Sequence, residues 1–220
     1  MPRVKKLSGN MLDHFSIDLM SSDLDDAKNF AYQRVLLSAD HYKKRGQEDL
    51  DKIQEDIITG ALGERAICDL LRFFKQVPPP DFQVYAPGEK SWAADFTDED
   101  GNKYHCKSQT IASAKKYGHS YILQFDGEGS GHKDPLFDLH NPFWGLKCTD
   151  FFIPCCVDVD NLSVDIFGVI PVDLLFSESN HLIKLPKATA LQETKRAIYL
   201  KDILKLSFLQ RWGVLFNKRK

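Results

Sequence analysis

Residues that could carry acid, base or metal chemistry gather near the middle of the chain. Asp95 lies in a run that is otherwise apolar and aromatic, and His105, Lys107 and Gln109 follow at every second position. Because successive side chains of a strand point to opposite faces, this alternation predicts that the three share one face. A carboxylate can ligate a hard cation, and an ammonium can hold a water or offset charge on a phosphate. An exposed polar face of an antiparallel sheet is the alternative interpretation.

A carboxylate on a helix could join this group. Glu64 lies in the segment 60–64 (GALGE), four residues after Gly60 and four before Cys68, so it shares a helix face with apolar residues. A carboxylate there needs a partner, and Gly60 and Gly63 allow a sheet or a ligand to come close. The alternative is a surface glutamate paired with a nearby Arg or Lys.

Two helices and several short strands are expected to position these residues. Cap and acidic residues at 21–26 predict a helix through Leu37, and apolar residues at steps of three, four or seven predict another over about Glu48–Phe74. A turn at 98–102 (DEDGN) predicts a hairpin. The expected strands are Phe82–Tyr85, Trp92–Thr97, Lys103–Gln109, Ser120–Phe125, Phe151–Val157 and Leu162–Ile170.

The end of the chain is basic, although the net charge is only −2. Residues 1–180 carry a net −10 and residues 181–220 a net +8. Lys and Arg on phosphates release counterions, so this segment suits a polyanion, and a solvated basic tail is the alternative. A helix over Leu191–Leu206 is expected to carry most of the contacts. The predicted nucleic-acid-binding residues are Lys195, Arg196, Lys201, Lys205 and Arg211.

Length and composition predict one α/β domain of 220 residues, with a central mixed β-sheet flanked by helices. Residues 1–47 are expected to be a helical extension, 48–170 the core and 171–220 a basic C-terminal segment. No apolar run approaches the roughly 18 residues of a spanning helix, and no apolar segment follows the basic start. The five cysteines form no regular framework and indicate reduced thiols. We therefore expect a cytoplasmic protein without a membrane partner.

Over about residues 49–170, the order of these motifs resembles the PD-(D/E)xK nuclease superfamily. The matching residues are GALGE at 60–64, Ala94-Asp95-Phe96, the Asp100-Gly101 turn and His105-Cys106-Lys107-Ser108-Gln109. The resemblance implies a restriction-endonuclease-like core. It also implies that Asp95 is a metal ligand, Lys107 the catalytic lysine, Glu64 the helix acid and Gln109 an auxiliary group.

The chain departs from this pattern at one position. His105 stands two residues before Lys107, where the family usually has Glu, Asp or Gln. A neutral imidazole can ligate a divalent metal, but it brings no negative charge and is softer than the oxygens that Mg²⁺ prefers. The substitution therefore predicts weaker metal affinity or a preference for Mn²⁺, and it leaves open a member that has lost catalysis.

The resemblance implies a metal-dependent endonuclease that hydrolyses DNA with Mg²⁺ or Mn²⁺, with Asp95, His105 and Glu64 at the metal. The alternatives are a non-catalytic nucleic-acid-binding module and a member that cleaves RNA. A third hypothesis, an interaction protein with structural zinc, lacks the close ligand pairs typical of such sites. Its candidate ligands are His119, His132, His140, Cys148, Cys155 and Cys156. The sequence leaves open whether the chain forms a homodimer.

Overall fold

The computed structural model describes residues 4–7, 14–44, 47–85, 94–124, 150–176 and 195–216. The helices are α1 (Ser21–Lys44), α2 (Leu50–Leu71), α3 (Ile111–Tyr117), α4 (Val172–Phe176), α5 (Leu200–Ile203) and α6 (Phe208–Phe216). The strands are β1 (Val4–Leu7), β2 (His14–Asp18), β3 (Phe96–Thr97), β4 (Lys103–Thr110), β5 (Ser120–Gln124), β6 (Phe151–Asp158), β7 (Ser163–Ile166), β8 (Ile170–Pro171) and β9 (Lys195–Tyr199).

The central sheet is mixed, as predicted. Its strand order is β1-β2-β7-β6-β4-β3, and β8 pairs with the start of β6. β4 and β6 run parallel and are separated in sequence by α3 and β5, whereas the other strand pairs of this sheet are antiparallel. β5 and β9 form a second, two-stranded antiparallel sheet.

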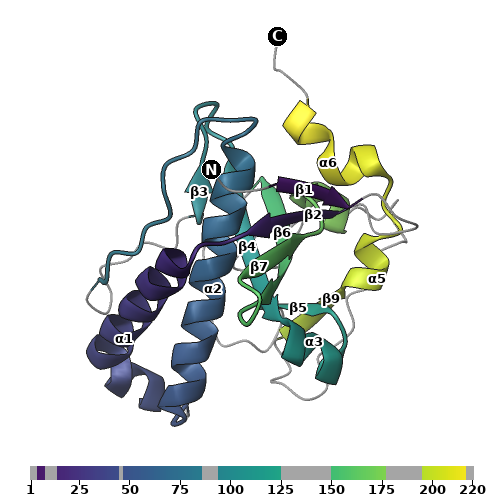
Figure 1. Ribbon diagram of the computed structural model, residues 1–220. Coiled ribbons are helices and arrows are strands. Elements are labelled where there is room, and N and C mark those ends of the chain that lie inside the picture. Colours follow the sequence, from purple (N-terminus) through teal and green to yellow (C-terminus); the bar gives the residue numbers. More distant parts are fainter. Residues whose placement is uncertain are drawn as a thin grey trace, which may run out of the picture.

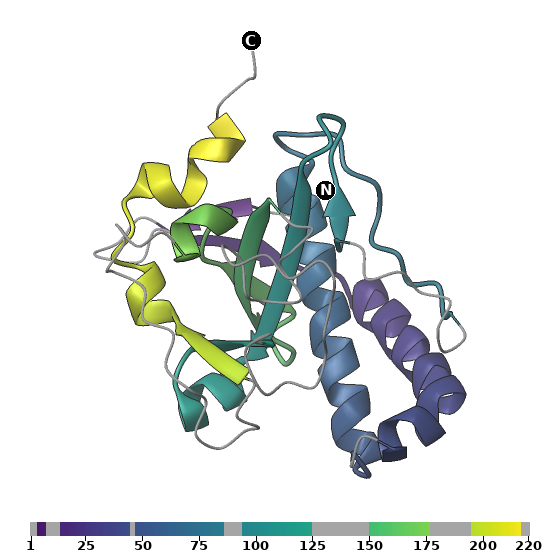
Figure 2. The ribbon, with the colours of Figure 1, turned by 180° about the vertical axis from the view of Figure 1, so that it is seen from behind.

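Helices cover the central sheet on both faces (Figures 1 and 2). The long helices α1 and α2 lie side by side on one face, and α3, α5 and the small sheet lie on the other. The side chains of β6 divide between these layers: Ile153 and Cys155 pack with Leu62 of α2, and Phe152 and Cys156 pack on the opposite side. A strand buried on both faces reads as a continuous apolar run, which is why the sequence predicted β6 well.

The two predicted N-terminal helices are confirmed, with bounds set by local hydrogen bonds. α2 begins after Asp49, whose carboxylate accepts a hydrogen bond from the N–H of Lys52 at 2.9 Å. The helix ends at Leu71, before Pro78, and the N–H of Arg72 closes its last turn on the carbonyl of Cys68.

The prediction that residues 1–47 are a helical extension is wrong at its beginning. β1 and β2 precede α1, and β2 pairs with β7 in the central sheet, where Ile17 lies opposite Val164. Ile17 is fully buried in the main core. The segment before α1 is therefore part of the sheet.

Two other segments differ from their predicted type. Residues 82–85 are not a strand; Phe82 instead stacks on Phe30 of α1, with ring centroids 5.3 Å apart. The predicted helix Leu191–Leu206 is wrong, because 195–199 forms β9 and only 200–203 is helical. Residues 195–199 form a strand because they pair with β5, where Ile198 lies opposite Tyr121. This pairing outweighs the helical spacing of the apolar residues.

Within the described ranges, no helix combines the length and the apolar character needed to cross a membrane. The four cysteines in the same ranges are free and buried, as predicted for reduced thiols. His132, His140 and Cys148 of the zinc hypothesis lie outside the described residues.

Candidate active site

The β3–β4 hairpin brings Asp95 and His105 into contact. The described part of the predicted strand Trp92–Thr97 is shorter than expected, but the N–H of Asp95 still donates to the carbonyl of Tyr104 at 3.0 Å. Asp95 Oδ2 accepts a hydrogen bond from the N–H of Cys106 at 2.7 Å and lies 3.1 Å from His105 Nδ1. The predicted opposition of Asp95 and the polar face of β4 is therefore present.

These neighbours keep the Asp95 carboxylate charged. Its side chain is 23% exposed, and burial by itself raises the pKa. The hydrogen bond and charge of His105, the N–H of Cys106 and the charge of Lys107 together outweigh burial and lower the pKa below its ordinary value. Asp95 is thus ionised at neutral pH, as a cation ligand must be.

The charges of Glu64 and Lys107 both affect the pKa of the buried Cys106 thiol. Burial is the largest cause that raises the Cys106 pKa, followed by the charges of Asp95 and Glu64, and the charge of Lys107 opposes them. Glu64 of α2, Asp95 just before β3 and Lys107 of β4 therefore all influence this part of β4; Cys106 packs on the α2 side of the sheet, and Lys107 alternates to the other side.

The packing of α2 on the sheet places Glu64 there. A Cβ added to the neighbouring Gly63 would lie 2.0 Å from Ser108 Oγ and 3.0 Å from Cys155 Sγ. Only glycine allows α2 to approach β4 and β6 this closely. The glycine predicted to permit a close approach is confirmed in that role.

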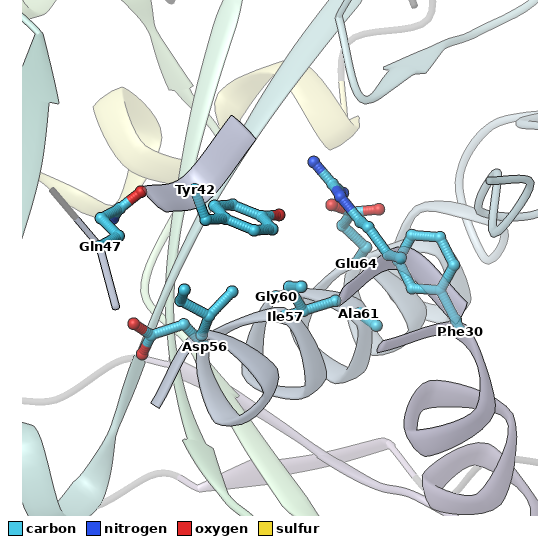
Figure 3. Close-up of a pocket in the computed structure, with 10 residues that line it drawn as sticks. Phe30, Tyr42, Gln47, Asp56, Ile57, Gly60, Ala61 and Glu64 are labelled. Carbon is cyan, nitrogen blue, oxygen red and sulfur yellow. The ribbon is translucent and has the colours of Figure 1, made fainter. Parts of the chain in front are cut away.

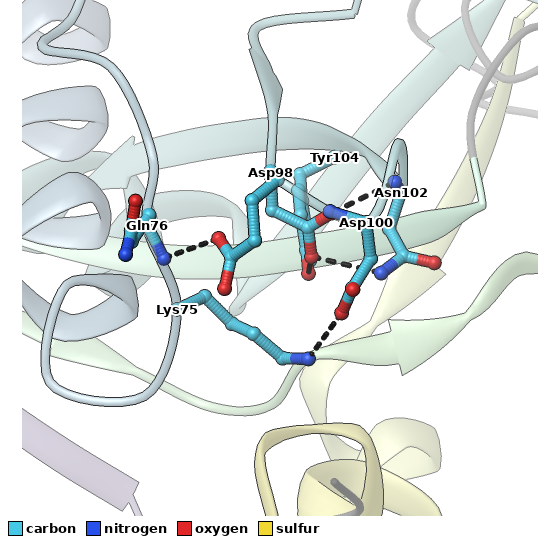
Figure 4. Close-up of polar contacts among 7 residues, drawn as sticks. Lys75, Gln76, Asp98, Asp100, Asn102 and Tyr104 are labelled. Carbon is cyan, nitrogen blue, oxygen red and sulfur yellow. Dashed lines mark hydrogen bonds and ion pairs between the residues drawn. The ribbon is translucent and has the colours of Figure 1, made fainter. Parts of the chain in front are cut away.

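A hydrogen-bonded turn fixes the hairpin on which Asp95 and His105 face each other (Figure 4). The buried Asp98 carboxylate accepts hydrogen bonds from the N–H and side-chain amide of Asn102, both at 2.8 Å, and from the Tyr104 hydroxyl at 2.7 Å. Lys75 pairs with Asp100 at 2.9 Å and attaches the turn to the end of α2. Gly101 occupies a left-handed conformation (φ 80°), which favours glycine.

Gln109 is not the auxiliary site residue that was expected. It shares a strand face with His105 and Lys107, but it is only 9% exposed, and its amide forms hydrogen bonds with neighbouring backbone groups. Its Nε2 donates to the carbonyl of Gly118 at 3.1 Å, and its Oε1 accepts from the N–H of Ser120 at 3.0 Å. Gln109 therefore closes the connection between α3 and β5.

The predicted basic surface is only partly available. Arg211 is 4% exposed and donates to the carbonyls of Leu206 and Phe167, so its assignment as a phosphate contact is wrong. Lys201 is exposed above the ring of Tyr199, and Lys205 is exposed and paired with Asp202 at 2.5 Å. Lys195 and Arg196 lie in β9.

The carboxylate of Asp95 and the imidazole of His105 are suitable ligands for a divalent cation, but two ligands are fewer than a metal site needs. Within the described ranges, no group of three or more His, Cys, Asp or Glu side chains is close enough to hold a metal ion. The two nitrogens of an imidazole point in different directions, so one ion cannot bind both Asp95 and His105 Nε2 while Nδ1 contacts Asp95. His105 Nε2 is buried and has no hydrogen-bond partner in the part of the chain that the structure describes.

A cavity that no sequence pattern predicted adjoins Glu64 (Figure 3). The cavity lies between α1 and α2 and has a volume of about 280 Å³. Its walls include Phe30, Arg34, Tyr42, Gln47, Gly60 and Glu64. Because these residues come from two helices and the loop between them, no local spacing marks the cavity; Gly60 is the one signal that the sequence offered.

The chain matches no known family model, no curated protein and no solved structure.

Proposed function

We propose that the protein is a metal-dependent endonuclease that hydrolyses phosphodiester bonds of DNA. The observation that carries the proposal is the contact of an ionised Asp95 with His105 and with the N–H of Cys106 on β4, where the charges of Lys107 and Glu64 also act. The order of these residues, on α2, just before β3 and on β4, is the order by which the sequence resembles the PD-(D/E)xK nucleases. A restriction-endonuclease-like core and a cytoplasmic location belong to the same proposal.

Each of these residues has its own role in the proposed hydrolysis. Asp95 supplies negative charge for a cation, with Glu64 as the second acid, directly or through water. Lys107 orients the attacking water and offsets charge on the scissile phosphate. Since His105 Nδ1 contacts Asp95, His105 orients that carboxylate in this arrangement. Mg²⁺ or Mn²⁺, when bound, would lower the pKa of the attacking water and stabilise the phosphate charge.

One specific observation favours a second function. The Asp95 oxygen that contacts His105 also accepts from Cys106, and the described residues form no three-ligand group. A non-catalytic nucleic-acid-binding module would have the same arrangement, with Lys107 as a phosphate contact.

Cleavage assays with matched variants decide between the two functions. Plasmid, single-stranded DNA and RNA are incubated with Mg²⁺, Mn²⁺ or EDTA. We expect metal-dependent cleavage of DNA by the wild-type chain and its loss in Asp95→Asn and in Lys107→Met. Lys103→Met, an exposed lysine on the same strand, is the control and should cleave normally.

Full activity in both site variants would reject the proposed active site, and cleavage in EDTA would reject the metal. Binding of nucleic acid without cleavage under every condition would favour the second function.

A further inference from the structure

The cavity between α1 and α2 combines an aromatic wall with polar groups. Phe30 is buried, stacks on Phe82 and has the guanidinium carbon of Arg34 5.8 Å from the centre of its ring, so Phe30 holds Arg34 in place. Tyr42 points across the cavity above Gly60, and its hydroxyl lies on the side of Glu64 (Figure 3). The Tyr42 ring, the Arg34 guanidinium and the Gln47 amide within about 280 Å³ suit one small planar heterocycle with polar edges.

Gly60 marks the place where a larger side chain would fill the cavity. Nothing in the described part of the chain comes within 4 Å of a Cβ added there, so packing does not require a glycine. Gly60 is nevertheless in the interior of α2, where glycine is among the least favourable residues. Gly63, on the same helix, is required by its contact with Ser108. Gly60 therefore borders the open floor of the cavity, whereas Gly63 is packed against the sheet.

The cavity also adjoins the candidate active site. Glu64 lines the cavity, and the charge of its carboxylate raises the pKa of Cys106 on β4. A group bound above Gly60 would therefore lie beside Glu64, the helix acid of the proposed active site. The adjacent Asp56 is paired with Lys52, which offsets its charge at the rim.

We infer that this cavity binds an unpaired nucleobase of the substrate strand next to the scissile phosphate. The inference rests on the proposed function and extends it to a substrate class, single-stranded or locally unpaired nucleic acid. A base in a duplex is stacked and paired, so it would have to leave the helix to enter. Stacking on aromatic side chains is tolerant of sequence, so no base preference is required.

Filling the cavity from its floor tests the inference without relying on catalysis. Binding of a labelled single-stranded oligonucleotide and of the matching duplex is measured by fluorescence anisotropy in EDTA. Gly60→Leu should weaken single-strand binding about 10-fold, the size of one lost base stack, and leave duplex binding unchanged. Gly60→Ala, which adds only a Cβ in open space, should bind as wild type does.

An oligonucleotide with abasic sites provides the reciprocal control. It should bind the wild-type chain as weakly as the intact strand binds Gly60→Leu. Should Gly60→Leu fail to fold, Tyr42→Ala with Tyr42→Phe as its control removes the opposite wall of the cavity instead.

The outcomes distinguish failure of the nucleobase inference from failure of the proposed function. Equal single-strand affinity of Gly60→Leu and wild type, or of abasic and intact strands, overturns the inference while cleavage of DNA still supports the proposed function. A wild-type chain that binds no nucleic acid overturns both.

Discussion

The charge of Asp95 depends on its neighbours more than on solvent. Burial opposes ionisation, and the largest opposing effect is the hydrogen bond from His105. His105, which departs from the nuclease pattern that the sequence resembles, is therefore the residue that most favours the charged form of Asp95. In the proposed site His105 acts as a positioning group for Asp95, and its role as a metal ligand stays a prediction.

Variants of His105 should change metal dependence in opposite directions. His105→Ala removes the group that orients Asp95 and should lower Mg²⁺-supported cleavage about 10- to 100-fold, as for other residues that orient metal ligands. His105→Glu adds a carboxylate and should retain or raise that activity. Cleavage rates are measured against Mg²⁺ concentration, with the exposed His119→Ala as control. Indifference to both changes would make His105 a bystander.

At the level of elements, α2 has two glycines with opposite roles. Gly63 lies against Ser108 and Cys155, and Gly60 faces open space. Gly63 therefore allows α2 to pack closely on the sheet, and Gly60 borders the cavity beside it.

Alanine at each glycine should change stability with opposite sign. Gly63→Ala should lower the free energy of unfolding by about 2 kcal/mol, because overpacking exceeds the gain in helix propensity. Gly60→Ala should raise it by about 0.5 to 1 kcal/mol. Urea denaturation measures both. Ser108→Ala should restore part of the loss in Gly63→Ala, and equal stability of the two glycine variants would contradict the packing argument.

The turn of the β3–β4 hairpin should make stability depend on pH. The hydrogen bonds to Asp98 outweigh burial and lower its pKa, so the stabilisation is present above the ordinary carboxyl pKa of about 3.9 and is lost as pH falls through the lower folded value. Asp98→Ala should reduce the free energy of unfolding at pH 7 by about 3 kcal/mol.

Below about pH 4, wild type should approach the stability of Asp98→Ala, because protonation removes the same interactions. Denaturation at several pH values measures this convergence, and Asp160→Ala, at an exposed turn, is the control. A constant difference between wild type and Asp98→Ala down to pH 2 would contradict the assignment.

At the scale of the whole molecule, β9 and α5 place basic residues on the sheet face opposite α1 and α2. β9 pairs with β5, and β5 is linked to β4 through the hydrogen bond from Ser120 to Gln109. His105 and Lys107 share the strand face of Gln109. In the proposed function, a phosphate backbone would therefore lie along β9 on the sheet side that carries His105 and Lys107.

Neutralising this surface should flatten the salt dependence of binding. Each phosphate contact adds roughly 0.9 to the slope of log affinity against log salt for duplex DNA, so changing Lys195, Arg196, Lys201 and Lys205 to Gln should reduce that slope by up to about 3 to 4. Lys28→Gln with Lys43→Gln on α1 is the control. An unchanged slope would assign these charges to solubility. Arg211→Met should lower the melting temperature and leave the slope of the folded protein unchanged, because Arg211 is buried.

The sequence by itself determined the elements whose signals are local. Caps and apolar periodicity gave α1 and α2, a turn with Gly101 gave the hairpin, and a continuous apolar run gave β6. The opposition of Asp95 and His105 follows from the hairpin, so it could be predicted too. These features depend on residues that are close in the chain.

The tertiary structure decided the features that depend on distant partners. β2 forms on β7, and β9 forms on β5 in place of a predicted helix, because strand pairing satisfies backbone groups far apart in sequence. Gln109 and Arg211 have the residue types of a site, but nearby carbonyls bind them in the interior. The cavity above Gly60 exists only because two helices pack side by side, and periodicity along one helix cannot show where its neighbour leaves space.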